Sequence, residues 1–291
     1  MIISVSYKTD IPAFYGNWFR RRLDAGYCKM VNPYGGQIYT VSLKQEDVTG
    51  FVFWTRNVAP FTDHLHEVAR RGYPFYLQFT LTGYPRPLEP AVIAPKHAIE
   101  QIQMLCRTYG TRAVVWRYDP ILFSSLTTVE KHRHTFTHFA RTLAGQVDEV
   151  VISFAQIYRK SKRNLNYAAT QHGFTWHDPP DGIKRELADE LARIADSCGM
   201  KFSICAQRQF VAGQIRDARC IDLHRLSDIA GRELYAPAKP HRDACGCFAA
   251  KDIGAYDTCP QGCVYCYAVR NPQIAKTQLK THNPESEILD R

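Results

Sequence analysis

Runs of β-branched and aromatic residues alternate with amphipathic stretches along most of the chain. Seven such runs predict β-strands, at residues 2–8, 50–57, 74–81, 112–120, 148–154, 201–205 and 251–256. The stretches between them predict helices, between Pro12 and Gly26, near residues 60–71, 95–109 and 182–199, and after a capping box of Thr127 and Glu130. The basic stretch YRKSKR (158–163) follows a predicted strand and is predicted to be a loop.

Strands that alternate with helices favour an α/β fold with a parallel sheet. Because crossovers between parallel strands are right-handed, we expect the sheet to curl into a (β/α) barrel or a partial TIM-like barrel. A doubly wound open sheet is the alternative. The chain has 291 residues, and it contains no repeat, low-complexity tract or linker. We therefore expect one domain over residues 1–291.

Charge and cysteine content narrow the functional classes. The net charge of +9 suits an anionic partner, such as a phosphorylated metabolite or a nucleic acid, and an ordinary basic surface is equally compatible with it. The first residues do not resemble a secretory signal and no apolar run is long enough to span a bilayer, so we expect a cytoplasmic protein without membrane contact. In that compartment, ten cysteines favour metal ligands or catalytic thiols over disulfides.

Polar residues gather where the predicted strands end. Active sites of parallel α/β proteins lie at the carboxyl ends of the strands, which makes these side chains candidates for binding a ligand. Arg117 and Asp119 are two positions apart on one strand and face the same side, where a buried guanidinium and carboxylate must pair or hold a ligand. The candidates from strand ends are Thr55, Arg56, Gln78, Arg117 and Asp119.

Three cysteines lie within eight positions of the stretch YDTCPQGCVYCYA. Cys259, Cys263 and Cys266 have C-x3-C-x2-C spacing, which suits three thiolates around one side of a cubic 4Fe–4S cluster and leaves one iron open. A structural zinc site needs four ligands and fits this odd number only with help from a distant residue. The stretch therefore predicts an iron–sulfur site that can bind a small molecule at its open iron.

This spacing, with Tyr265 before the last cysteine, resembles the signature of the radical S-adenosylmethionine superfamily. Gly262 and the ending Cys266-Tyr267-Ala268 are most similar to the spore photoproduct lyase branch. The whole chain resembles a bacterial domain-of-unknown-function family of that superfamily, whose cysteine motif lies near the C-terminus. The segments that carry this wider resemblance are YKTDIPAF, FVFWTRN, QFTLTGYPRPLEP, WRYDPIL and DIGAYDTC.

The resemblance implies an activity and a set of partners. A site-differentiated 4Fe–4S cluster would bind S-adenosylmethionine and, on reduction, yield a 5′-deoxyadenosyl radical that abstracts hydrogen from a substrate. Tyr265 and Tyr267 would flank the cluster or the adenine, and the five strand-end residues would contact the cofactor's carboxylate, ribose or sulfonium. The substrate, a small molecule or a nucleic acid, is not identified by the sequence. An external electron donor such as flavodoxin or ferredoxin is implied.

The position of the motif departs from the superfamily pattern, in which the cysteines follow the first strand. Here they follow the last predicted strand, and residues 251–272 combine that strand with the cysteine loop. A circularly permuted barrel explains the difference if residues 251–256 lie beside residues 2–8. Chain ends of compact domains are often close, which permits this pairing.

Four further cysteines suggest a second site. Cys205 ends a predicted strand, Cys220 lies in a loop, and Cys245 and Cys247 form the sequence CGC. Together they could bind a second, closed 4Fe–4S cluster that staples the segment 205–250, which has little strand or helix pattern of its own. Alternatively they are separate packing residues, as expected for Cys28, Cys106 and Cys198.

A non-catalytic function is the competing interpretation. An iron–sulfur or zinc module that binds nucleic acid through its basic surface needs neither an open iron nor a cofactor pocket. The alternating strands and helices and the polar strand ends favour the enzyme.

Overall fold

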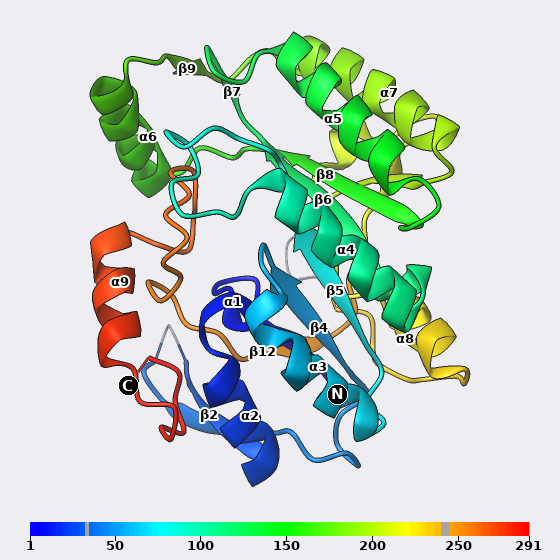
Figure 1. Ribbon diagram of the computed structural model, residues 1–291, viewed down its shortest axis with the longest axis vertical. Coiled ribbons are helices and arrows are strands. Elements are labelled where there is room, and N and C mark those ends of the chain that lie inside the picture. Colours follow the sequence, from blue (N-terminus) through cyan, green and yellow to red (C-terminus); the bar gives the residue numbers. More distant parts are fainter. Residues whose placement is uncertain (33–34, 240–244, 291) are drawn as a thin grey trace.

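A parallel sheet organises the part of the chain that the structure describes, which comprises residues 1–32, 35–239 and 245–290 of a computed structural model. In this part, eight strands pair in one sheet (Figure 1). From one edge to the other they are β11 (Arg216–Asp217), β10 (Lys201–Ile204), β8 (Glu149–Phe154), β6 (Val114–Ile121), β5 (Phe75–Thr80), β4 (Gly50–Thr55), β1 (Ile2–Val5) and β12 (Ala250–Asp252).

Helices connect most of these strands. They are α1 (Ile11–Phe14), α2 (Gly16–Ala25), α3 (Thr62–Arg70), α4 (Pro95–Tyr109), α5 (Val129–Leu143), α6 (Arg159–His172), α7 (Asp181–Ser197), α8 (Leu223–Ala230) and α9 (Pro272–Thr281). Short 3-10 helices cover Ala59–Phe61, Thr111–Ala113 and Arg208–Phe210. Two antiparallel pairs stand outside the main sheet: β2 (Tyr27–Val31) with β3 (Ile38–Ser42), and β7 (Phe123–Ser124) with β9 (Trp176–His177).

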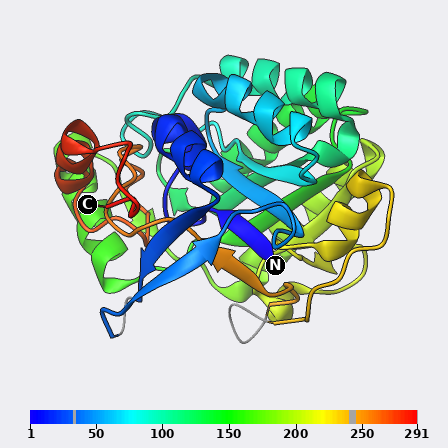
Figure 2. The same ribbon diagram turned by 90° about the horizontal axis from the view of Figure 1, so that it is seen from below.

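The two faces of the sheet are covered differently. Alternate strand residues such as Ile3, Phe53 and Leu77 pack in one large core with apolar residues of α2, α3, α4, α5 and α7. The other alternate set, which includes Ile2, Val52 and Tyr76, packs against α8 and its flanking segments. Figure 2 shows this asymmetry, with helices on one side of the sheet and the yellow and orange part of the chain on the other. We call this second side the inner face.

Most predicted elements of the sheet are confirmed. Each of the seven predicted strands overlaps an observed strand, and the helix predicted at 95–109 has those bounds. The strand predicted at 251–256 is shorter, because pairing stops at Asp252. The parallel α/β sheet is therefore established. Closure into a barrel is not confirmed, since β11 and β12 do not pair with each other in the described residues.

Three local predictions were wrong. Helix α5 is capped by Thr128, whose side chain accepts a hydrogen bond from Lys131 N, whereas Thr127 donates to Leu122 O. The stretch YRKSKR is mainly the first turns of α6 and not a loop. The segment 205–250 has a helix of its own, α8, although its residues 240–244 lie outside the described residues. The antiparallel pair β2–β3 was not predicted at all.

The pairing of β12 with β1 confirms that the last predicted strand lies beside the first. Residues 2–4 of β1 pair in parallel with residues 250–252 of β12, next to the N-terminus in Figure 2. The carboxylate of Asp252 then accepts hydrogen bonds from Ser4 Oγ at 2.8 Å, Ser6 Oγ at 2.7 Å and Tyr7 N at 3.1 Å. A Cβ at Gly254 would overlap Ser6 Oγ, so glycine is required where the chain leaves β12.

No helix of the described residues is long and apolar enough to cross a membrane.

Candidate functional site

The three clustered cysteines lie in a loop at the carboxyl end of β12, which we call the cysteine loop (residues 257–270). Asp257 closes it: its backbone N donates to Ala268 O at 3.0 Å, and its carboxylate accepts hydrogen bonds from the backbone N and from Nε of Arg270. Asp257 has a φ of 61°, a left-handed conformation in which Asp is tolerated better than most residues. The loop is thus closed by its own first and last residues. It appears in orange between α6 and α9 in Figure 1.

The loop also rests on the segment that follows β5. Val264 N donates to Leu88 O at 3.1 Å, and Ala91 N donates to Gln261 O at 3.3 Å. Gly262 has a φ of 77°, and a Cβ there would lie 3.0 Å from Pro90 Cγ. Gly262, which the sequence singles out between Cys259 and Cys263, therefore meets both a backbone and a packing requirement.

The three cysteines of the loop are half-buried, and a backbone donor reaches the sulfur atom of Cys266. Burial raises the pKa of Cys259 and Cys266 and raises that of Cys263 to about 12, although the positive charge of Arg56 opposes this at Cys263. Ala268 N donates to Cys266 Sγ at 3.3 Å. Free thiols here are protonated at neutral pH, so a metal that binds them must displace their protons.

Tyr265 is held by a buried ionic network. Its hydroxyl donates to Glu89 Oε1 and accepts a hydrogen bond from Arg56 Nη2 at 2.7 Å. Arg56 Nη1 is 2.9 Å from the same Glu89 oxygen, which also accepts from Thr82 Oγ1 at 2.7 Å. The ring packs edge-on against Tyr84. Arg56 and Tyr265, both predicted site residues, thus fix the cysteine loop to the ends of β4 and β5.

A second network joins the loop to β4 through Asp10. The carboxylate of Asp10 accepts from Thr55 Oγ1 at 2.8 Å, Arg56 N at 2.9 Å and Gln261 Nε2 at 3.0 Å. The other amide atom, Gln261 Oε1, is buried without a hydrogen-bond partner. A bound group that donates a hydrogen bond would satisfy this acceptor. Tyr267, also a predicted site residue, donates to Tyr7 O at 2.9 Å.

The other three predicted strand-end residues form a separate group on the inner face. Arg117 and Asp119 pair with each other, and Arg117 Nε lies 2.9 Å from Asp119 Oδ1. Of the two alternatives expected from the sequence, pairing or holding a ligand, the structure shows the pairing. Ser153 Oγ donates to Asp119 Oδ2 at 3.2 Å. Arg117 Nη1 also reaches Gln78 Oε1 at 3.2 Å and Cys220 Sγ at 3.0 Å. Gln78, Arg117 and Asp119 thus make these contacts with one another and with Cys220, whereas Thr55, Arg56, Tyr265 and Tyr267 hold the cysteine loop.

The four further cysteines lie together beside this group. Cys205 Sγ and Cys220 Sγ are 3.3 Å apart, and thiol hydrogen bonds continue from Cys220 to Cys247 and from Cys247 to Cys245. We call them the four-thiol group. Of the remaining cysteines, Cys28 lies in β2, Cys106 in α4 and Cys198 directly after α7. Cys28 and Cys106 are buried in the large core, and Cys198 packs at its margin.

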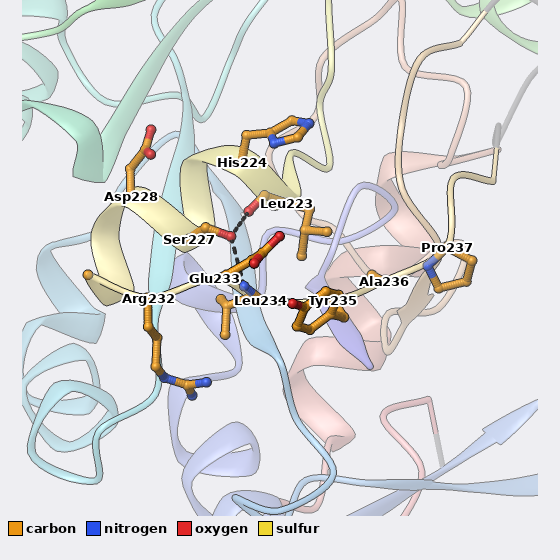
Figure 3. Close-up of a pocket in the computed structure, with 11 residues that line it drawn as sticks. Leu223, His224, Ser227, Asp228, Arg232, Glu233, Leu234, Tyr235, Ala236 and Pro237 are labelled. Atoms are coloured by element: carbon orange, nitrogen blue, oxygen red, sulfur yellow. Dashed lines mark hydrogen bonds between the residues drawn. The ribbon is translucent and has the colours of Figure 1, made fainter.

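Two pockets lie near these sites, and no cysteine lines either of them. One of about 240 Å³ borders the Arg56–Glu89 network and is lined by Arg56, Thr82, Arg86 and Glu89 among others. A larger pocket of about 800 Å³ lies along α8 and the residues after it, where Ser227 links Leu223 O to Leu234 N (Figure 3). Its lining residues, 223–237 in part, include no cysteine.

The fit to a metal depends on donor chemistry. No group of three or more His, Cys, Asp or Glu side chains in the described residues is arranged to hold a metal ion. The thiolates of a 4Fe–4S cluster each bind a different iron and need not converge on one point. Three half-buried cysteines in one closed loop, with a backbone donor to one sulfur and an unpaired buried acceptor at Gln261, suit such a cluster and a small ligand on it.

Several residues that build the site were missed. Glu89, Gln261, Asp257 and Arg270 hold the loop, and Asp252 holds its strand. The signal for Glu89 was an isolated carboxylate in a proline-rich stretch directly after a strand. Gln261 lies inside the cysteine motif, but nothing in its spacing marks it as a contact of Asp10.

A family model matches almost the whole chain. It is described as Domain of unknown function (DUF1848) and matches residues 2–268, which include β1 and the three cysteines of the loop. No curated protein and no solved structure matches the chain.

Proposed function

The chain belongs to the DUF1848 family, and we propose that it is a radical S-adenosylmethionine enzyme whose 4Fe–4S cluster is held by Cys259, Cys263 and Cys266. The observation that carries this proposal is the cysteine loop itself. Three cysteines with the spacing of the superfamily lie in one closed loop, at the carboxyl end of a parallel strand, where α/β enzymes hold their ligands.

The donor set supports a cluster with one open iron. Three thiols are available within the loop, and the next four cysteines belong to a different group. When bound, the cluster supplies the electron that cleaves S-adenosylmethionine and starts radical chemistry on a substrate. The protein's part is to hold the cofactor, orient it and exclude water.

The chain's residues have definable roles in this proposal. Arg56 places a positive charge near Cys263, where it favours the thiolate that a metal requires. Tyr265, held by Glu89 and Arg56, fixes the position of the last turn of the loop. Gln261 Oε1 is a buried acceptor for a donor group of the bound cofactor, such as its amine. Thr55, through Asp10, keeps Gln261 in place.

The topology is compatible with a permuted partial barrel. In the superfamily pattern, the cysteines follow the first strand. Here β12 forms an edge beside β1, and the helices packed on one face leave the opposite, inner face to carry polar residues at the strand ends. We therefore propose that β12 takes the place of the usual first strand. Gln78, Arg117 and Asp119 line this inner face and are the nearest candidates for contacts beyond the loop.

Cofactor cleavage tests the proposal. Protein purified and reconstituted without oxygen is incubated with S-adenosylmethionine and dithionite, which replaces the natural electron donor, and 5′-deoxyadenosine is quantified. We expect product from the unaltered protein and none above background from Cys263→Ala, because that variant lacks one of three cluster ligands. Cys106→Ala, which removes a buried cysteine of α4 outside both groups, is the matched control and should remain active.

Two other results would redirect the interpretation. Iron and sulfide bound by the loop without any cleavage of S-adenosylmethionine would favour the non-catalytic module, and binding of nucleic acid would then be measured directly. Product formation that persists in the separate Cys259→Ala, Cys263→Ala and Cys266→Ala variants would refute the enzyme mechanism.

A further inference from the structure

Four cysteines from three separate parts of the chain meet on the inner face. Cys205 directly follows β10, Cys220 lies three residues after β11, and Cys245 and Cys247 precede β12. Their thiols form a continuous series of contacts, of which Cys205 Sγ to Cys220 Sγ is 3.3 Å. Cys220, Cys245 and Cys247 are buried, and Cys205 is half-buried. Ordinary apolar packing does not explain why cysteines from three different segments contact one another and not other apolar residues.

Hydrogen-bond donors are directed at these sulfur atoms. Arg117 Nη1 donates to Cys220 Sγ at 3.0 Å, and Ile221 N donates to Cys247 Sγ at 3.4 Å. Sulfur in a thiol is a weak acceptor, whereas a metal-bound thiolate carries charge and uses such donors well. A buried guanidinium beside the group is a suitable counter-charge for several thiolates.

The backbone that carries the cysteines is fixed in position. Tyr76 Oη and Gln78 Nε2 both donate to Cys220 O at 2.8 Å. Phe248 N donates to Ile221 O at 3.1 Å, which joins the segment of Cys220 to that of Cys247. The surroundings are apolar, with Ala218, Ile221 and Leu234 in the same cluster of buried residues. Rigid backbone and dry surroundings are what a preorganised metal site requires.

We propose that Cys205, Cys220, Cys245 and Cys247 form a second, closed metal site with four thiolate ligands. Four thiolates can hold a 4Fe–4S cluster, in which each binds a different iron, and this cluster is the occupant that we propose. A zinc ion, on which the four sulfur atoms would have to converge, is the alternative outcome of the test. Such a site has no open position, so it does not bind S-adenosylmethionine. It fixes residues within 218–239 and 245–249 on the inner face, and residues 245–249 lead directly into β12, the edge strand that carries the cysteine loop.

This inference stands apart from the proposed function, because it concerns different ligands. The decisive protein is therefore the triple variant Cys259→Ala, Cys263→Ala, Cys266→Ala, in which the loop cannot hold a cluster. It is purified without oxygen, reconstituted separately with iron and sulfide and with zinc, and desalted. Metal and sulfide per chain are then measured. We expect about four irons with sulfide to remain on the variant.

Variants of the four-thiol group provide the contrast. Adding Cys247→Ser to the triple variant should remove the bound metal almost completely, whereas adding Cys106→Ala should leave it unchanged. Because Cys247→Ser could impair folding, X-ray absorption at the metal edge is measured on the triple variant itself. Sulfur neighbours with iron–iron scattering identify the cluster, and four sulfur neighbours around zinc identify a zinc site of the same ligands.

The outcomes separate clearly. Metal surrounded only by sulfur in the triple variant supports the four-thiolate site, and the element identifies its occupant. A folded triple variant, judged by circular dichroism, that retains neither iron nor zinc after reconstitution would overturn the inference, and the four cysteines would then be packing residues. Neither result depends on whether the intact protein cleaves S-adenosylmethionine.

Discussion

The cysteine loop and the four-thiol group differ in how their members are brought together. The three cysteines of the loop lie within eight positions, and the loop is closed by a clamp between Asp257 and Arg270. The four-thiol group collects residues from position 205 to position 247, so it exists only when β10, β11 and β12 are all in place. The cysteine loop is a local structure that packs against the end of the sheet, whereas the four-thiol group forms only when the sheet brings distant residues together.

Both groups nevertheless use the same device, a buried arginine that is paired with a carboxylate. Arg56 pairs with Glu89 next to the loop, and Arg117 pairs with Asp119 next to Cys220. The side chain of Arg56 is 11% exposed and that of Arg117 is 6% exposed. Each arginine links its cysteines to a strand end, so substitutions at these two positions test whether the sites are independent.

The largest effect is expected from Arg117→Met and Arg56→Met, compared as a pair. Each leaves a buried carboxylate without its partner, which destabilises a protein by about 3–5 kcal/mol. Denaturant unfolding should show similar losses, while metal analysis should show that Arg117→Met affects the four-thiol group and Arg56→Met the loop. Equal loss of metal from both groups in both variants would show that the sites are coupled and not independent.

Acid should lower the stability of the fold that both cysteine groups depend on, through the buried His132. Burial lowers the pKa of His132 to about 4, while its hydrogen bonds to Tyr118 and Leu122 O are made by the neutral ring. The unfolded chain takes up a proton near pH 6.5 and the folded chain does not, so stability is full above pH 6.5 and falls by about 3 kcal/mol toward pH 4.

Unfolding curves measured from pH 7 to pH 4 test this effect of His132. His132→Leu should flatten the pH dependence, whereas the exposed His138→Gln on the same helix should preserve it. An unchanged slope in His132→Leu would assign the acid sensitivity to other groups.

A smaller and more local effect is expected from Gly262→Ala. The added Cβ meets Pro90, and the left-handed backbone is unfavourable for alanine by about 1–2 kcal/mol. Loop iron and cofactor cleavage should fall, while metal of the four-thiol group is retained. Gly173→Ala is the control, since it also has a positive φ but its added Cβ would meet nothing within 4 Å. Similar loss of loop iron in both variants would contradict a role for the Pro90 contact.

The smallest effect should follow Arg270→Ala. Its side chain is 66% exposed, and exposed ion pairs contribute about 0–1 kcal/mol. The backbone N of Arg270 still donates to Asp257, so the loop should stay closed and hold its iron. Asp257→Ala removes both bonds and should lower iron content more. If the two variants lose the same amount of iron, the side-chain bond from Arg270 Nε to Asp257 is the one that keeps the loop closed.

The sequence predicts the long strands of the main sheet better than it predicts the short strands and the antiparallel pairs outside that sheet. Strands such as 50–57 and 148–154 are apolar runs bounded by polar residues, and their pattern is decided locally. The short strands β7, β9 and β11 have only two residues each. Burial alternates along β2, but the first three residues of its partner β3 are all exposed. β7 and β9 pair across more than fifty residues, which a local pattern does not reveal, and β2 and β3 are neighbours in the chain whose mostly exposed second strand gives no apolar run.

The candidate sites show the same limit. Spacing alone identifies Cys259, Cys263 and Cys266, because the ligands of one loop are neighbours in sequence. Strand-end placement finds Arg56 and Arg117, but it does not assign them to different groups of cysteines. That division depends on the order of strands in the sheet, in which β4 lies near the β12 edge and β6 nearer to β10. Glu89 was missed because its partners Arg56 and Tyr265 are far from it in sequence.

The pairing of β1 with β12 also determines when β1 can be covered during synthesis of the chain. About 245 residues separate the two strands, so at about 5–20 residues per second the ribosome needs roughly 10–50 s between them. During this interval one edge of β1 has no partner, and such an edge can pair with other chains. The cysteine loop emerges later still. The proposed iron can therefore be loaded there only after the rest of the sheet has been synthesised. A nascent chain interrupted before residue 250 lacks both the protecting strand and the three cysteines that follow it.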